Sequence, residues 1–134
     1  MNSDKQAIAA VLTSYQAALG RSDADGVTRL FTTDGVLMAQ ESPSAVGAEA
    51  VAQAYGAMFG VIGLDIRFEI AEVRSLAPEW AFARTTSTGT IEIKATGARL
   101  PEANQELFIF QRLTGPGKSR ATASARQIRR APDA

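Results

Sequence analysis

The sequence predicts an α+β fold in which helices come first and a strongly curved antiparallel sheet follows. Helical periodicity is confined to residues 3–59, whereas residues 64–113 alternate apolar and polar side chains as strands do. A loop marked by Gly and Pro separates two long strands within residues 80–113. Helices packed on one face of a curved sheet leave a cavity between the two layers, and function is expected in that cavity.

Three helices are expected, over residues 3–20, 23–31 and 47–59. In the first and third, apolar side chains recur every three or four positions and form a stripe on one face. A short strand at 36–38 and a loop at 40–47 are expected to connect the second helix to the third.

The later strands differ in how they alternate. Residues 64–76 alternate cleanly until Ala71, where the phase slips, and this slip predicts a bulge. Residues 80–94 are rich in β-branched side chains and contain Gly89, which indicates a bulge or a sharp bend. Residues 106–113 are apolar on both faces, which predicts a central strand with cover on both sides.

Composition excludes several kinds of site. The chain of 134 residues contains no cysteine and no histidine, so catalysis would have to use carboxylates, Tyr, Lys or Arg. We expect a single domain, no metal and no other cofactor. The start MNSDKQ is polar, and no apolar run is long enough to span a bilayer. We therefore expect a cytoplasmic protein without a membrane partner.

The zero net charge conceals an uneven distribution. Residues 1–113 hold nine Lys/Arg and thirteen Asp/Glu, a net charge of −4. Residues 114–134 hold five Lys/Arg and one Asp, a net charge of +4, and form an atypical basic C-terminal segment. This segment lacks aromatic side chains on which bases could stack, so no nucleic-acid partner is expected. Alternating alanines at 121–125 predict a final strand that has little to bury.

Three stretches carry a resemblance to a known family: IAAVLTSYQAALGRSDADGVTRLFTTDGVLM, GAEAVAQAYGAMF and AFARTTSTGTIEIKATGARLPEANQELFIFQR. They make residues 5–113 similar to the nuclear transport factor 2 (NTF2)-like superfamily, in its SnoaL-like and ketosteroid isomerase-like branch. The resemblance implies a cone-shaped fold in which three N-terminal helices pack on a strongly curved mixed or antiparallel sheet around a pocket. It does not fix an activity, because one fold hosts many functions.

The resemblance to ketosteroid isomerase also implies roles for individual residues. Tyr15 matches the tyrosine that donates a hydrogen bond to the substrate oxygen, and Glu106 falls where the isomerase has a protonated aspartic acid. The general base of the isomerase falls at about Ala39, which cannot accept a proton, and Gln40 beside it is not a base. We therefore interpret Tyr15 and Glu106 as candidate catalytic residues, although a core tyrosine and an ion-paired carboxylate are the structural alternatives.

Further residues are expected to line the ligand pocket, and each has a structural alternative. Aromatic and Met side chains at these positions are also typical of a core or a dimer interface. Arg84 is also expected to pair with a carboxylate. The expected pocket residues are Met38, Gln40, Tyr55, Phe59, Trp80, Phe82, Arg84 and Phe108.

Two functions fit these features. In the first, the protein binds a small hydrophobic molecule, polyketide- or steroid-like, as a SnoaL-like isomerase or cyclase would. In the second, it is a non-catalytic dimerisation or ligand-sensing module, which the missing base favours. A homodimer through the uncovered sheet face is expected in either case.

The C-terminal sequence departs from that of similar proteins, which usually end in a strand resembling G-x-W-K-I-A-R-Y-x-F. Here the sequence is GPGKSRATASARQIRR. Codons read one nucleotide upstream permit W-K-I-A-R-Y-C-F-S from Gly117 onward, and we interpret the change as a frameshift near Gly115. Sequencing of the gene would decide the matter.

Overall fold

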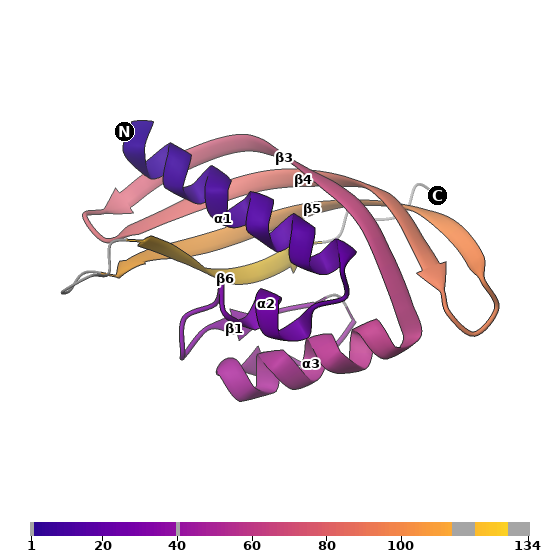
Figure 1. Cartoon of the computed structure of the whole chain (residues 1–134). Helices are drawn as coiled ribbons and strands as arrows, with labels where there is room; N and C mark the ends of the chain where they lie inside the picture. The colour runs from indigo at the N-terminus through magenta and orange to yellow at the C-terminus, as the bar shows by residue number, and fades with distance from the viewer. Residues whose placement is uncertain (1, 40, 114–119, 129–134) are drawn as a thin grey trace.

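The computed structural model describes residues 2–39, 41–113 and 120–128. Its helices come first and its long strands last, as Figure 1 shows. The elements in chain order are α1 (Asn2–Gly20), α2 (Ala24–Thr28), β1 (Val36–Leu37), β2 (Ala45–Val46), α3 (Ala48–Val61), β3 (Ile62–Ala77), β4 (Trp80–Ile93), β5 (Ala98–Leu113) and β6 (Arg120–Ile128). The expected α+β order of helices and strands is confirmed.

The main sheet has four antiparallel strands in the order β3-β4-β5-β6, and β1 and β2 form a separate pair. The strands β3, β4 and β5 are long and bend together, with α1 lying along one face and α3 beneath the bent end of β3 (Figure 1). The final strand pairs with Gln105–Leu113 of β5, so the expected strand at the C-terminal end exists. The expectation that this strand has little to bury concerns side chains that lie outside the described part of the chain.

One face of the sheet carries the core because side chains alternate along each strand. In β4, Ala81, Ala83, Thr85 and Ser87 are buried beneath the helices, whereas Arg84 between them is exposed. The buried apolar set from both layers is Ile8, Leu12, Ala18, Leu19, Val27, Phe31, Leu37, Val51, Tyr55, Phe59, Ala81, Ala83, Phe108 and Phe110. This inner face therefore positions any site, and small side chains on β4 leave room there.

Two long-range hydrogen bonds fasten the helices to the sheet. The edge strand β3 leaves backbone groups unpaired, and the side-chain oxygen of Gln16 accepts from the Phe68 N–H at 3.0 Å. Lys94, just beyond β4, donates to the Phe59 carbonyl near the end of α3, where a cation suits the helix dipole. Both bonds fix the distance between α1, α3 and the curved strands.

The sheet confirms the irregularity predicted at Ala71 and excludes one of the two alternatives expected at Gly89. The register shifts between Ile70 and Glu72, at the point where the alternation slips at Ala71. At Gly89 the register is continuous, so of the two alternatives expected there, a bulge or a sharp bend, the bulge is absent. A Cβ on Gly89 would lie 1.9 Å from the Asp65 carbonyl oxygen, so the glycine permits a close approach of two backbones.

The second long strand starts earlier than expected, at Ala98 rather than Glu106. Pro101 indicates a loop from the sequence, yet it pairs with Thr90 inside the sheet. The described part of β6 pairs with β5 only from Gln105 onward, so residues 98–104 border the sheet in that part of the chain. A border position tolerates proline because no partner there needs its missing N–H. This extension adds residues to the inner face.

Other boundaries differ slightly. Asp23 caps α2 by accepting from the Gly26 N–H at 2.9 Å, which is why the helix starts at Ala24. Residues Ala45–Val46, expected in a loop, pair with β1 because their backbone completes its short ladder. Within the described residues, no helix is both long and apolar enough to cross a bilayer.

Candidate functional site

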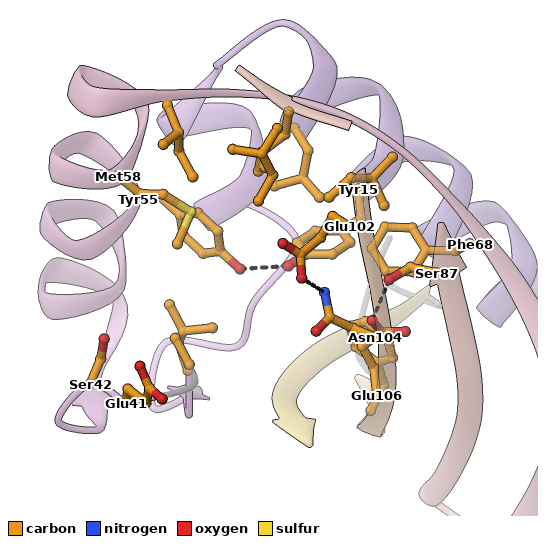
Figure 2. A pocket seen from close by; sticks show the side chains of 18 residues that line it. Tyr15, Glu41, Ser42, Tyr55, Met58, Phe68, Ser87, Glu102, Asn104 and Glu106 are labelled. Carbon is orange, nitrogen blue, oxygen red and sulfur yellow. Dashed lines mark hydrogen bonds between the residues drawn. The ribbon is translucent and has the colours of Figure 1, made fainter. Parts of the chain in front are cut away.

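A cavity of about 280 Å³ lies between the inner face of the sheet and the helices. Figure 2 shows its side chains converging from both layers. Its lining residues are Tyr15, Leu19, Leu37, Ala39, Glu41, Ser42, Tyr55, Met58, Ile62, Leu64, Ile66, Phe68, Ser87, Ile91, Glu102, Asn104, Glu106 and Phe108. Its walls are mainly aliphatic and aromatic, with polar groups at a few positions, as in most small-molecule sites.

The two tyrosines of the chain meet in this cavity. The hydroxyls of Tyr15 on α1 and Tyr55 on α3 are 2.6 Å apart and hydrogen-bonded (Figure 2). Aromatic neighbours hold the Tyr15 ring, with Phe68 and Phe108 at centroid distances of 5.5 and 5.7 Å. One hydroxyl proton is used within the pair, so the second is available to an acceptor in the cavity.

Burial keeps both tyrosines protonated. It raises the pKa of Tyr15 to about 12, with the nearby charge of Glu106 adding to the effect and the Tyr55 hydrogen bond opposing it. Burial also raises the pKa of Tyr55 well above 10.0, and Tyr15 adds to this shift. The pair therefore acts as a neutral hydrogen-bond donor over the ordinary pH range.

We predict that tyrosinate will not form in the folded protein when the pH is raised through 10.0, the ordinary tyrosine pKa. Because the folded pKa values are raised, protein stability contributed by the neutral pair is present below that pH and is lost as pH rises through the folded pKa. Ultraviolet titration measures this directly, since the chain has only two tyrosines. The chain in urea is the control, and a folded-state midpoint near 10 would contradict the prediction.

Glu106 is buried on β5, and its two carboxyl oxygens accept hydrogen bonds from hydroxyls on β4. The Thr85 hydroxyl donates at 2.7 Å and the Ser87 hydroxyl at 2.5 Å. Burial raises the pKa of Glu106, and the bonds from Ser87 and Thr85 oppose this shift. This carboxyl therefore holds its proton more readily than an exposed one.

Several polar residues that the sequence did not indicate also line the cavity, and three of them lie on the sheet. Asn104 on β5 donates from Nδ2 to Glu102 at 2.9 Å, and Ser87 lies opposite on β4. Glu102, Asn104, Glu106 and Phe108 are two residues apart, so a strand drawn back to Ala98 places all of them on one face. Pro101 predicts a loop, so the alternation at Glu102 and Asn104 is not interpreted as part of a strand from the sequence.

The structure brings together four residues of the expected site, Tyr15, Tyr55, Glu106 and Phe108, around this cavity. Gln40 lies outside the described residues. Phe59 is buried in the core beside Tyr55, and Met38 is 36% exposed; neither lines the cavity.

Three other residues expected in the pocket lie on the outer face of β4, and their placement in this cavity is corrected. Trp80, Phe82 and Arg84 alternate with the buried Ala81, Ala83 and Thr85, so they point away from the helices. The Arg84 guanidinium donates to Glu72 at 2.8 Å, the carboxylate partner that its alternative role required. This hydrogen bond lowers the pKa of Glu72.

Charge in the cavity is one-sided. Among the described residues that line it, Glu41, Glu102 and Glu106 carry carboxyl groups and none is Lys or Arg. No cluster of carboxylates suited to a metal ion occurs among the described residues. The described part of the lining thus offers hydrogen bonds but no cation to receive an anionic ligand.

Sequence and structure comparisons agree on the family. A SnoaL-like domain matches residues 12–115. The chain belongs to the SnoaL-like family. A ketosteroid isomerase-like protein from Erwinia carotovora atroseptica SCRI1043 is similar to this SnoaL-like chain at 34% identity and a TM-score of 0.84, covering 96% of this chain and 98% of that one. No curated protein matches the sequence.

More distant structures share the fold of this SnoaL-like domain. A conserved protein from Planctomyces limnophilus DSM 3776 aligns at 19% identity and a TM-score of 0.79, covering 95% of this chain and 94% of that one. An NTF-2 like protein of unknown function from Shewanella oneidensis MR-1 aligns at 14% identity and a TM-score of 0.70, covering 92% and 97%. The expected NTF2-like superfamily is thereby confirmed.

Proposed function

We propose that this SnoaL-like protein binds a small, uncharged, hydrophobic carbonyl compound in its cavity, of polyketide- or steroid-like chemistry. The observation that carries the proposal is the hydroxyl pair of Tyr15 and Tyr55, 2.6 Å apart, whose remaining proton is available in an apolar cavity. A carbonyl oxygen is the natural acceptor for such a donor.

Size and charge narrow the ligand class. The cavity volume of about 280 Å³ is close to the lower end of the usual range for ligand sites, roughly 300–1,000 Å³. A compact ring system suits this volume. The carboxyl groups of Glu41, Glu102 and Glu106 disfavour an anion, because a buried anion without a cationic partner is strongly destabilised.

A matched pair of probes tests the proposal. We expect 1-tetralone to bind about tenfold more tightly than tetralin, which has the same rings but no carbonyl, because one hydrogen bond separates them. Protein-observed NMR titration measures both affinities. Tyr55→Phe and Tyr15→Phe should each reduce the preference for the ketone, since each removes a member of the donor pair.

The control is Gln53→Leu, which changes an exposed residue on α3 outside the cavity lining and should leave the preference unchanged. Absence of binding by either probe to the wild type, or equal affinity for ketone and hydrocarbon, would contradict the proposal. Perturbation confined to residues outside the cavity would contradict it too.

Turnover is a second step beyond binding. The resemblance to ketosteroid isomerase implies a donor pair in Tyr15 and Glu106, although both oxygens of Glu106 accept hydrogen bonds from Thr85 and Ser87. Ala39, at the position of the base, lines the cavity without a proton acceptor. Glu41 also lines it, two residues further on. The missing base supports the alternative function, a non-catalytic ligand-sensing or dimerisation module.

We also propose that two copies associate through the outer sheet face. Trp80 is 43% exposed there, and Phe82 and Ile109, which pair across β4 and β5, are half-buried.

We predict that light scattering at micromolar concentration gives about twice the 14.2 kDa of one chain. Ile109→Lys should give the monomer mass, because a buried unpaired ammonium opposes association. The control Gln53→Lys, on an exposed helix position, should stay dimeric, and a wild-type mass of one chain would contradict this proposal.

A further inference from the structure

Asn104 is a buried amide whose orientation is set by its neighbour. Its exposed fraction is 6%, and its Nδ2 donates to a carboxyl oxygen of Glu102 at 2.9 Å. The reverse orientation would place the amide oxygen against a carboxylate, which is an acceptor and repels it. The Glu102 carboxylate therefore fixes which end of the amide faces elsewhere.

The other end of this amide is its oxygen, Oδ1. Among the described residues no group donates to Asn104 Oδ1, although the atom is buried. In Figure 2 the amide nitrogen is turned to Glu102, and the amide oxygen is turned away from it. Buried polar atoms are almost always hydrogen-bonded, so an atom of a ligand cavity without a partner among the described residues is a candidate contact for a ligand.

Packing gives no reason for an amide at this position. Asn104 lies on the inner face of β5 between Glu102 and Glu106, opposite Ser87, where an apolar side chain of the same size would fill the same space. The Glu102–Asn104 pair and the Tyr15–Tyr55 pair come from different layers, the sheet and the helices. The cavity thus has a donor pair from the helices and a separate acceptor from the sheet.

We propose that Asn104 is the specificity-determining residue of this cavity, and that its Oδ1 accepts a hydrogen bond from a hydroxyl or N–H group of the ligand. Glu102 is a positioning residue that keeps the amide oxygen facing the ligand. This inference rests on the proposed binding function and refines its ligand class to uncharged hydroxy-carbonyl compounds. An ether or second carbonyl at that end is disfavoured, because its lone pairs would face Oδ1 and leave that oxygen unpaired.

The test uses 6-hydroxy-1-tetralone and 6-methoxy-1-tetralone, which share rings and carbonyl but differ in the hydrogen-bond donor. At about pH 6, well below the pKa of a phenol, both are uncharged. We expect the wild type to bind the hydroxy probe roughly 10- to 100-fold more tightly than the methoxy probe by NMR titration or calorimetry. Only the hydroxy probe should shift the side-chain amide resonances of Asn104 in the manner of a hydrogen-bonded carbonyl.

Two variants separate the roles of the pair. Asn104→Leu should abolish the preference for the hydroxy probe while keeping affinity for the methoxy probe. Glu102→Gln should reduce the preference for the hydroxy probe, and both probes should still bind. A glutamine amide can pair with either orientation of the Asn104 amide, so Asn104 would no longer be held in one orientation. A residue that only supported the fold would change both affinities equally. The matched control Gln53→Leu should keep the wild-type ratio.

The outcomes distinguish this inference from the proposed function. Equal affinities of the two substituted probes in the wild type, with 1-tetralone still preferred over tetralin, would overturn the role of Asn104 and leave carbonyl binding intact. Failure of all four compounds to bind would overturn both. If Asn104→Leu does not fold, the ratio of the affinities for the hydroxy and methoxy probes in the wild type and in Glu102→Gln still tests the inference. An unchanged ratio in Glu102→Gln would overturn the positioning role of Glu102.

Discussion

Ala39→Asp should convert this protein into an isomerase of β,γ-unsaturated ketones. Ala39 lines the cavity that also contains Tyr15 and Glu106, and the resemblance to ketosteroid isomerase implies that the general base belongs at this position. General-base catalysis contributes about 10²–10⁴-fold, so we expect a gain of that order over the wild type, whose turnover of a 3-oxo-Δ5 steroid should be close to background. Absorbance of the conjugated product measures the rate.

Ala39→Asn is the matched control, because it has the shape of aspartate but cannot accept the proton, and it should show no gain. Adding Tyr15→Phe to Ala39→Asp should lower the gained activity, since the oxyanion loses its donor. A wild-type rate close to that of Ala39→Asp would contradict the prediction and would assign the base to Glu41, the nearby carboxylate of the lining.

Gly89→Ala should destabilise the protein by at least about 3 kcal/mol, a large part of the usual 5–15 kcal/mol of a domain. The added methyl group would lie 1.9 Å from the Asp65 carbonyl oxygen and 2.8 Å from the Ile66 Cα, both backbone atoms of β3. Backbone cannot rotate aside as a side chain can, so β3 and β4 would have to separate at their bend. The midpoint of urea unfolding measures the loss.

Gly56→Ala is the matched control, because no atom lies within 4 Å of its added Cβ. Gly56 is an exposed residue within α3, where alanine reduces the entropy of the unfolded chain, so we expect a gain of about 0.5–1 kcal/mol. A lower urea midpoint for Gly89→Ala and a higher one for Gly56→Ala would show that the contact of the added methyl group, and not the loss of a glycine, sets the change in stability. A Gly89→Ala midpoint equal to that of the wild type would contradict the close approach at the bend.

The sequence alone determined the order of layers and most element types, because periodicity is a local property. The phase slip at Ala71 located the bulge between Ile70 and Glu72, and the apolar run at 106–113 identified a strand that lies between two others. Resemblance placed Tyr15 and Glu106 in one cavity, where the structure also has them. The pairing of Tyr15 with Tyr55, 40 residues apart, has no local signal.

Tertiary structure decided the rest of the candidate site. Alternation assigned Trp80, Phe82 and Arg84 to a common face, but only the helices show that this is the outer face. Pro101 predicts a loop by its chemistry, yet a strand border accepts it, and this brings Glu102 and Asn104 to the inner face. A sequence specifies which side chains share a face; packing of one layer on another decides which face is enclosed, because burial depends on residues far apart along the chain.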